Sequence, residues 1–312
     1  MRASVLLFAC FEVDPDRWRH ELKRGLPALE VRMWPDAGDP HEIDYVLVWN
    51  HPSGFLRQFP NLRAIFSMGA GVDRLLLDPE LPAQVPLVRM ADPGLAVFMK
   101  EYVLVRVLHY HRDMPTYEQQ QRTALWRQLP PRETRERRVG VMGVGQIGGT
   151  CARALAELGF EVRGFALRAR EIPGVKVLAG PKRLREFLSG IEILICLLPL
   201  TAETRGILNA EHFALLARGA WLINLGRGAH LVEADLLHAL DSGQLAGATL
   251  DVFATEPLPS AHPFWRDPRI TITPHASALT RPETAVPRLL NNIARERAGQ
   301  PLLDLIDRAA GY

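Results

Sequence analysis

The sequence contains few cysteines, and none of them is placed for chemistry. Its 312 residues include three, Cys10, Cys151 and Cys196, which lie far apart in apolar segments. No two of them have the spacing of a disulfide framework, a redox motif or a metal site. The pattern predicts buried, reduced thiols in a cytoplasmic protein and no bound metal.

Long runs of one charge are absent as well. Lysine and arginine together number 37, aspartate and glutamate 35, and the pI is about 8.5. Although the pI is slightly basic, the chain has no basic tract that would suit a polyanion, so we expect no nucleic-acid partner.

No apolar stretch reaches the roughly 18–20 residues that are needed to span a bilayer, so we expect no membrane partner. The segment VLLFACF near the N-terminus lacks a preceding basic run, and Glu12, Asp14 and Asp16 follow it at once. It therefore predicts a first β-strand rather than the core of a signal peptide.

Short apolar runs alternate with amphipathic segments along most of the chain, which predicts α/β units with parallel sheets. A first series of predicted strands runs from VLLFACF to VPLVRM, with helical connections at 15–25, 53–59 and 71–77. A second series begins at RRVGVMG and ends at ITITPH. We therefore predict two Rossmann-like or flavodoxin-like, doubly wound parallel-sheet domains.

One long helix and a polar arm connect the two series. The run GLAVFMKEYVLVRVLHYHRDM has apolar residues at helical spacing, and Met114-Pro115 is expected to end it. The arm that follows, residues 115–131, carries Tyr117, Leu125 and Trp126. Such side chains suit packing on another subunit, and packing on the arm's own domain is an equal alternative. We predict a homodimer formed through this arm, since two-fold assemblies are the commonest oligomers.

A glycine fingerprint follows the first strand of the second series. In VGVMGVGQIG, Gly143 permits a tight turn, Gly145 lets backbone N–H groups approach a pyrophosphate, and Gly148 allows a helix to sit close to the strand. A glycine-rich turn without a ligand is the alternative. Gln146 and Ile147, which begin the predicted helix, complete this candidate cofactor site.

The end of the next strand has no acidic residue to bind the ribose of NAD. Ala166 stands there, and Arg168 and Arg170 follow it. A 2′-phosphate would be repelled by a carboxylate and bound by a guanidinium, so the sequence favours NADP(H), with NAD(H) possible. Two solvated surface arginines are the competing interpretation.

Three later strands each end next to a single charged or titratable side chain. WLINLGRG contains Arg227, LDVFATEP contains Glu256, and ITITPHAS contains His275. In an open parallel sheet such strand ends line the ligand crevice. Each residue alone has an ordinary structural explanation, but their joint occurrence predicts a catalytic site.

These motifs, together with GVGQIG and SMGAGVD, resemble the D-isomer-specific 2-hydroxyacid dehydrogenase family over nearly the whole chain. The resemblance implies NADPH-dependent reduction of small 2-oxo acids, glyoxylate to glycolate and hydroxypyruvate to D-glycerate. Arg227 would hold the substrate carboxylate, His275 would donate the proton, and Glu256 would orient the His275 ring and favour its charged form.

The resemblance implies further contacts. Asp251 would lie near the nicotinamide carboxamide, and Leu198, Pro199 and Thr204 would border the cofactor riboses. The expected substrate contacts are Trp49, Met68, Gly69, Ala70 and Gly71, besides Arg227 and His275.

We predict a substrate domain formed by residues 1–98 and 283–312 and a dinucleotide-binding domain formed by 99–282, with the active site in the cleft between them. Two other functions stay open. One is reduction of larger 2-oxo acids of the phenylpyruvate type, and the other is a non-catalytic corepressor that senses the dinucleotide.

Overall fold

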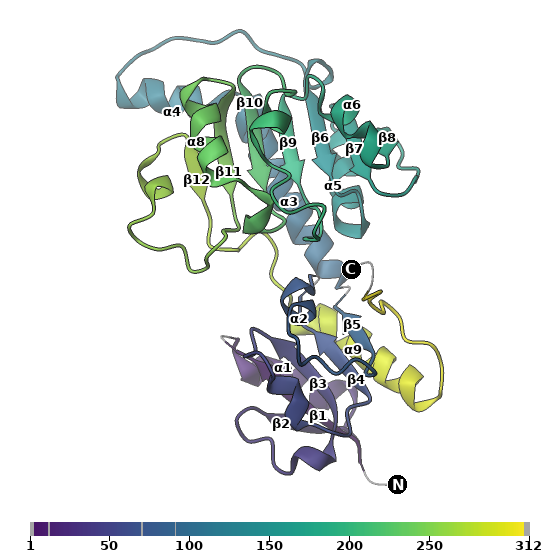
Figure 1. The fold of residues 1–312 in the computed structure, drawn as a ribbon. Helices are drawn as coiled ribbons and strands as arrows, with labels where there is room; N and C mark the ends of the chain where they lie inside the picture. Colours follow the sequence, from purple (N-terminus) through teal and green to yellow (C-terminus); the bar gives the residue numbers. More distant parts are fainter. Residues whose placement is uncertain (1–2, 12, 70, 91, 309–312) are drawn as a thin grey trace. The chain divides into compact units, whose positions relative to one another are not determined.

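The computed structural model describes residues 3–11, 13–69, 71–90 and 92–308. Contacts between Cα atoms divide the chain into two compact units (Figure 1). Unit 1 comprises Met1–Leu95 and Thr280–Tyr312, and unit 2 comprises Ala96–Leu279. Each crossing between the units lies three residues before the boundary predicted from the sequence. The assignment of the units as substrate and cofactor domains stays a prediction.

Unit 1 is built on a five-stranded sheet with strand order β2-β1-β3-β4-β5, in which all neighbouring strands are parallel. This is the flavodoxin-like order. The strands are β1 (Val5–Cys10), β2 (Glu30–Met33), β3 (Ile43–Trp49), β4 (Ala64–Ser67) and β5 (Leu87–Arg89).

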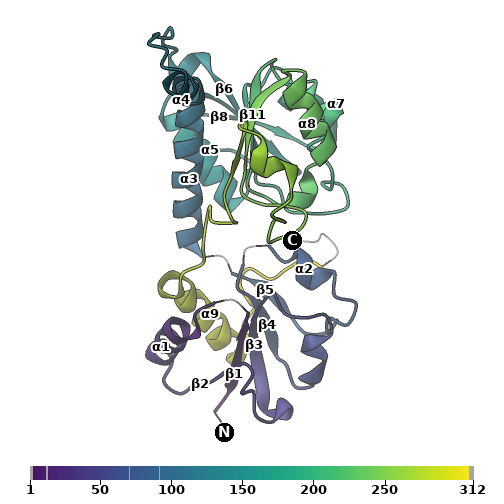
Figure 2. The same cartoon turned by 90° about the vertical axis from the view of Figure 1, so that its left-hand side faces the viewer.

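Helices cover both faces of this sheet, as Figure 2 shows. Leu6 and Phe8 of β1 pack with α1 and α9, whereas Leu7 packs with α2 and η2 on the other face. Every residue of β1 is buried as a result. The helical elements are α1 (Pro15–Gly25), η1 (Pro40–Glu42), η2 (Phe55–Gln58), α2 (Asp73–Leu76) and α9 (Pro282–Arg297).

Unit 2 holds a seven-stranded sheet with strand order β12-β11-β10-β9-β6-β7-β8, again with parallel neighbours throughout. The direction of winding reverses between β6 and β9, as in dinucleotide-binding folds. The strands are β6 (Arg138–Met142), β7 (Glu161–Ala166), β8 (Val175–Ala179), β9 (Ile193–Cys196), β10 (Ala220–Asn224), β11 (Leu245–Leu250) and β12 (Ile270–Ile272).

The helices of unit 2 form a layer on each face of its sheet (Figure 2). Most of α3 and α5 pack on one face, and α6, α7 and α8 pack on the other. The helical elements are α3 (Pro93–His111), α4 (Met114–Arg122), η3 (Thr134–Glu136), α5 (Gln146–Glu157), η4 (Pro181–Arg183), α6 (Leu184–Leu188), α7 (Ala210–Phe213), η5 (Gly228–His230), α8 (Glu233–Asp241) and η6 (Pro263–Arg266).

Two local predictions need correction. The long helix α3 ends at His111, three residues before the expected break, and Met114-Pro115 begins a second helix, α4, within the segment predicted as a polar arm. Proline suits that position because the first helical N–H groups have no partner within the helix. The helical connection predicted at 53–59 is the 3₁₀-helix η2 at Phe55–Gln58 and not an α-helix. Within the described residues, no helix is long and apolar enough to cross a membrane.

Candidate active site

The three charged or titratable residues predicted from the sequence follow three neighbouring strands. Arg227 comes after β10, Glu256 after β11 and His275 after β12, and these strands are adjacent in the sheet. The carboxyl ends of parallel strands meet at one edge, so the loops that carry the three side chains lie next to one another.

His275 and Glu256 form a hydrogen-bonded pair. Nδ1 of His275 lies 2.9 Å from Oε2 of Glu256, and Oε1 of Glu256 accepts the backbone N–H of Phe253 at 2.9 Å. Burial alone would raise the pKa of the Glu256 carboxyl, but these hydrogen bonds and the charges of His275 and Arg227 outweigh it and lower the pKa. The other ring nitrogen of His275, Nε2, has no partner among the described residues, and 37% of the side chain is exposed. The ring is therefore oriented through one nitrogen and open at the other.

Arg227 is held by the shape of its own loop. Its Nη1 donates to the Gly226 carbonyl at 2.8 Å, and its backbone N–H donates to Nδ1 of His230 at 3.0 Å. A Cβ at Gly228 would lie 1.8 Å from the carbonyl carbon of Phe253, so only glycine lets this loop pack against the loop that holds Glu256. The close approach explains why the charge of Arg227 helps to lower the pKa of Glu256.

His230 is a structural support of the Arg227 loop that sequence reasoning missed. Its ring is fully buried, and its Nε2 lies 3.2 Å from the Pro199 carbonyl oxygen while Nδ1 accepts from Arg227. Because Nδ1 is the acceptor, Nε2 carries the proton and donates it to Pro199. The histidine thus ties the Arg227 loop to the loop after β9. Its position at the end of NLGRGAH was the only signal in the sequence.

Asp251 has internal partners for its carboxylate. The side chain is fully buried and accepts hydrogen bonds from the Thr273 hydroxyl, the Ala276 N–H at 2.8 Å and the Ser277 N–H at 3.0 Å. All three donors belong to the loop that carries His275. The structure shows that Asp251 binds this loop through three hydrogen bonds. A contact between Asp251 and a nicotinamide stays a prediction.

The glycine fingerprint has the backbone that a dinucleotide requires. Gly143 has φ +91°, and a Cβ on Gly148 would lie 2.0 Å from the Gly143 carbonyl oxygen. A Cβ on Gly145 would meet no atom within 4 Å, and no side chain caps α5 there. The first N–H groups of α5, from Gln146 and Ile147 onward, therefore begin beside open space that can take a phosphate, and the loop fits the group that the fold implies.

The two arginines after β7 differ from each other. Arg170 is exposed and donates to the Val144 carbonyl of the glycine loop. Arg168 is also exposed, and its side chain has no hydrogen bond or ion pair within the described residues. Both arginines are compatible with a bound 2′-phosphate. Arg170 is held beside the glycine loop, and Arg168 has no partner in the described part of the chain that would compete with the phosphate.

The loop after β9 contains the other predicted cofactor contacts. Thr204 accepts the Thr201 N–H at 2.8 Å, and its hydroxyl donates to the Pro199 carbonyl at 2.7 Å. Leu198, between the strand and Pro199, packs partly buried against the core. Thr204 thus stabilises the loop through these two hydrogen bonds. Contacts between the loop and the cofactor riboses stay a prediction.

In unit 1 the predicted substrate residues lie at the carboxyl ends of β3 and β4: Trp49 is the last residue of β3, and Met68 comes directly after β4. A Cβ on Gly69 would lie 2.3 Å from Cζ3 of Trp49, so the indole ring rests directly on the Gly69 backbone. Met68 is buried, and the Ser67 hydroxyl donates to the carbonyl oxygens of Gly69 and Gly71 at 3.2 and 3.5 Å. Ala70 lies outside the described residues.

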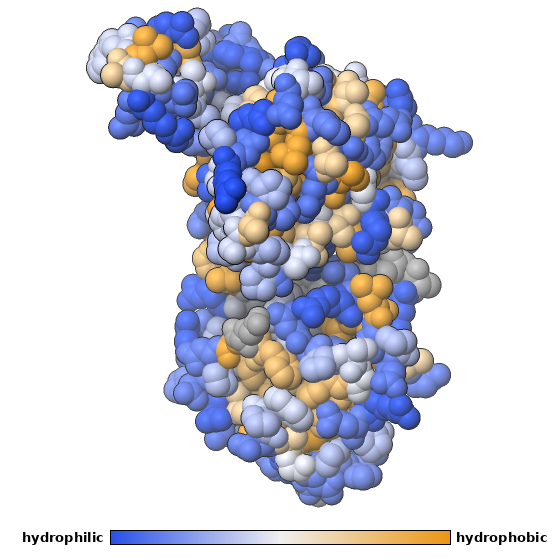
Figure 3. Space-filling view, turned by 60° about the vertical axis from the view of Figure 1, so that its left-hand side comes forward, coloured by the Kyte–Doolittle hydropathy of each residue, from blue (hydrophilic) through white to orange (hydrophobic). Residues whose placement is uncertain are grey.

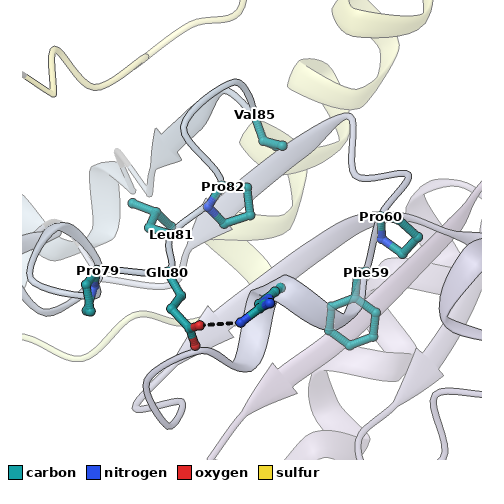
Figure 4. Close-up of a pocket in the computed structure, with 8 residues that line it drawn as sticks. Phe59, Pro60, Pro79, Glu80, Leu81, Pro82 and Val85 are labelled. Atoms are coloured by element: carbon teal, nitrogen blue, oxygen red, sulfur yellow. Dashed lines mark hydrogen bonds and ion pairs between the residues drawn. The ribbon is translucent and has the colours of Figure 1, made fainter.

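A hollow of about 410 Å³ in unit 1 lies elsewhere on the same sheet (Figure 4). Phe59 and Pro60 precede β4, and residues 79–85 precede β5, so the hollow is at the amino ends of these strands. An ion pair of 2.6 Å between Arg57 and Glu80 lies across it. Ligands of open α/β sheets bind at the carboxyl ends, so this hollow is not the substrate site.

The described part of the chain offers neither a metal site nor an exposed thiol. Among residues 3–11, 13–69, 71–90 and 92–308, no three His, Cys, Asp or Glu side chains gather in a way that suits a metal ion. Cys10, Cys151 and Cys196 are buried and free, and burial raises the pKa of the last two to about 12.

Known proteins resemble the chain over almost its full length. Glyoxylate/hydroxypyruvate reductase A of Serratia proteamaculans (strain 568) is 46% identical over 304 residues, which are 96% of this chain and 97% of the relative. The crystal structure of a D-isomer specific 2-hydroxyacid dehydrogenase from Xanthobacter autotrophicus Py2, in complex with NADPH and MES, has a TM-score of 0.96 and 42% identity. That comparison covers 99% of this chain and 100% of the other.

A second solved structure is similar to the same extent. The NADPH-dependent glyoxylate/hydroxypyruvate reductase of Sinorhizobium meliloti, in complex with NADP and sulfate, has a TM-score of 0.93 and 38% identity, and the match covers 99% of this chain and 100% of the other. Residues 104–277 match the family described as D-isomer specific 2-hydroxyacid dehydrogenase, NAD binding domain. These likenesses confirm the relationship and the fold class predicted from the motifs: the chain belongs to the D-isomer specific 2-hydroxyacid dehydrogenase family.

Proposed function

We propose that the protein is an NADPH-dependent reductase of small 2-oxo acids, which converts glyoxylate to glycolate and hydroxypyruvate to D-glycerate. The observation that carries the proposal is the His275–Glu256 pair beside Arg227 at three neighbouring strand ends. The names of the relatives at 43–46% identity, glyoxylate/hydroxypyruvate reductase A, support the choice of substrates.

The residues of the site supply what reduction of a 2-oxo acid requires from a protein. When bound, the nicotinamide cofactor supplies the hydride for the carbonyl carbon. Arg227 binds the substrate carboxylate with its planar fork and stabilises the charge that develops on the carbonyl oxygen. His275 donates a proton from Nε2 to that oxygen. Glu256 accepts from Nδ1, which fixes the ring and stabilises its charged form.

Unit 1 is proposed to contribute contacts with the acid itself, as the family resemblance implies. The backbone N–H groups of residues 69–71 would donate to the carboxylate. The Trp49 ring and Met68 would form an apolar wall. The contact between Trp49 and Gly69 supports this proposal, because it gives the ring a fixed position at the end of β3.

We infer a preference for NADP(H) over NAD(H). Arg168 has no acidic neighbour at the end of β7, where Ala166 stands, and Arg170 is already held beside the glycine loop. The two solved relatives described above contain NADPH or NADP. A 2′-phosphate gains charge-assisted hydrogen bonds from such guanidinium groups, whereas the 2′-hydroxyl of NAD gains less.

The test is a set of initial rates with the purified protein. Glyoxylate, hydroxypyruvate, pyruvate and phenylpyruvate are compared at matched concentrations with NADPH and with NADH, and His275→Gln serves as the inactive control. We expect the highest kcat/KM for glyoxylate and hydroxypyruvate, each with NADPH. A preference for phenylpyruvate would favour the reductase of larger acids. Binding of NADPH without turnover of any acid would favour the corepressor.

We also propose that the protein forms a homodimer through the arm at residues 115–131. Tyr117 accepts the Leu129 N–H at 3.0 Å, which braces the arm, and the Trp126 side chain is 98% exposed. In Figure 3 the segment projects from the rest of unit 2 and carries apolar side chains among polar ones. A tryptophan is rarely left in water, so we expect a partner subunit to cover it. Sedimentation of the wild type and of Trp126→Ala at micromolar concentration tests this, and a monomeric wild type would contradict it.

A cytoplasmic location is the last part of the proposal. It is supported by three buried thiols that form no disulfide, as is usual in reducing compartments. Fractionation of cells that express the tagged protein checks it.

A further inference from the structure

The loop that carries His275 has an uncommon backbone that must be held in place. His275 has φ +52°, a left-handed conformation that costs free energy for a residue with a Cβ. Its N–H donates to the Asp251 carbonyl at 2.8 Å, and the Asp251 carboxylate accepts the Ala276 and Ser277 N–H groups. Asp251 therefore fixes the backbone on the C-terminal side of His275.

A hydroxyl group fixes the other side of the loop. Thr273 donates its hydroxyl proton to Oδ1 of Asp251, and the Thr273 oxygen lies 2.6 Å from the hydroxyl of Tyr102. A threonine has one hydroxyl proton, and Asp251 takes it, so Tyr102 must be the donor of the second bond. The order of donors is Tyr102 to Thr273 to Asp251, and bonds in such a chain strengthen one another.

Tyr102 reaches this chain from a rigid element. It lies on α3, between the buried residues Met99 and Val103, and the Arg106 guanidinium lies 5.4 Å from its ring centre. It is 171 residues away from Thr273 in the sequence. The helix is thus fastened by a side chain to the loop of the proposed proton donor.

We propose that Tyr102 is a positioning residue for His275 and acts through Thr273 and Asp251. The inference rests on the proposed function, in which His275 is the proton donor. With the tyrosine hydroxyl in place, Thr273 has a single orientation and Asp251 keeps all of its donors. Without it, the Thr273 hydroxyl can rotate, and the left-handed turn at His275 loses part of its support.

The chain offers a matched control on the same helix. Tyr110 also makes a hydrogen bond with a threonine hydroxyl, that of Thr249 on β11, and its ring stacks on Trp221 at 4.1 Å. Among the described residues it has no bond to the loop at 273–277. Tyr110→Phe therefore removes the same group from the same helix without touching the proposed chain.

The experiment uses the full-length protein, first without cofactor. Amide hydrogen exchange is measured on peptides that contain residues 275–277 in the wild type, Tyr102→Phe and Tyr110→Phe. We expect Tyr102→Phe to speed exchange of these amides about 2- to 10-fold, the range for one neutral hydrogen bond, and Tyr110→Phe to leave them unchanged. Peptides from β6 and α5 report whether either variant disturbs the fold.

Kinetics with glyoxylate and NADPH form the second readout. We expect kcat to fall about 2- to 10-fold in Tyr102→Phe with little change in the KM for NADPH, and to fall further in Thr273→Val, which breaks both bonds. Thr273→Ser keeps the hydroxyl and should recover most of the activity lost in Thr273→Val.

One result would overturn the positioning role of Tyr102, and another would overturn the acid role of His275. If Tyr102→Phe and Tyr110→Phe behave alike in exchange and in kcat, the positioning role is overturned. If instead His275→Gln retains wild-type kcat, the acid role in the proposed function is wrong, and the exchange comparison still decides whether Tyr102 holds the loop.

Discussion

The carboxyl edges of the two parallel sheets are constructed in different ways. In unit 2 this edge carries a guanidinium, a carboxylate and an imidazole, and each of them is oriented by a further hydrogen bond. In unit 1 the corresponding edge carries an indole ring that rests on a glycine backbone. Similar α/β scaffolds thus supply similar strand ends, and the residues that follow the strands decide what each edge can do.

The difference has a physical reason. Charged groups that act on a reacting centre lose activity when they move, and each of the proposed catalytic groups is fixed by a second one: Glu256 for His275, the Phe253 N–H for Glu256, and His230 for the Arg227 loop. The apolar wall that we propose needs only shape, and packing against Gly69 provides that for Trp49. We therefore expect changes in unit 2 to affect the chemistry and changes in unit 1 to affect the choice of substrate.

The largest effect is expected at His275. His275→Ala removes the proposed proton donor and should lower kcat for glyoxylate about 10²- to 10⁴-fold, the usual contribution of a positioned acid. Binding of NADPH should change little, which fluorescence titration can check. A variant that keeps more than a tenth of the wild-type kcat would mean that another group donates the proton.

The second prediction concerns Arg168 and the choice of cofactor. Arg168→Ala should weaken NADPH binding roughly 10- to 150-fold, the range for a charge-assisted hydrogen bond, and should leave NADH binding nearly unchanged. Arg135→Ala, which removes an exposed positive charge in η3, before the amino end of β6, is the control. Equal losses for both cofactors would show that Arg168 does not recognise the 2′-phosphate.

The third prediction follows from the lowered pKa of Glu256. Because that pKa lies below its ordinary value, Glu256 stays ionised even as the pH falls below the neutral range, and its negative charge stabilises positive charge on the group that it contacts. Glu256→Gln keeps the shape and removes the charge, so the alkaline limb of kcat should move to lower pH. Both side chains are more than a third exposed, so solvent screens the pair and weakens the effect.

The sign of this shift is the decisive observation. Movement of the alkaline limb to higher pH, or no movement, would break the link between Glu256 and the proton donor. Glu233→Gln, which changes a carboxylate 3.2 Å from His262 on the same unit, tests whether any lost negative charge has the same effect.

The sequence predicted those parts of the site that depend on local pattern. The glycine fingerprint and Arg227, Glu256 and His275 each stand directly after an apolar strand, and a parallel sheet brings neighbouring strand ends together without further information. The doubly wound parallel-sheet class of both units also follows from the pattern and from the family relationship that these motifs indicate.

The parts that were missed depend on contacts between distant segments. His230 is an ordinary histidine in the sequence, and only the fold places its ring between Arg227 and Pro199. Tyr102 belongs to an apolar helical pattern that says nothing of Thr273. The start of α4 at Met114 was missed because a proline that ends one helix can equally begin the next.

The smallest effect is expected in unit 1, at Trp49. Trp49→Ala removes the ring that rests on Gly69 and leaves the charged cluster of unit 2 intact, so glyoxylate reduction should fall only modestly. The space that is opened should favour larger side chains, but it adds no new contact to bind them, so the gain is smaller than that of a fitted pocket. We expect the ratio of kcat/KM for phenylpyruvate to that for hydroxypyruvate to rise about threefold to tenfold, measured with NADPH at one pH. Trp265→Ala, which truncates a half-exposed tryptophan of unit 2, should leave the ratio unchanged. A loss of kcat for glyoxylate as large as that of His275→Ala would contradict the division between the two edges, since it would give Trp49 a part in the chemistry itself.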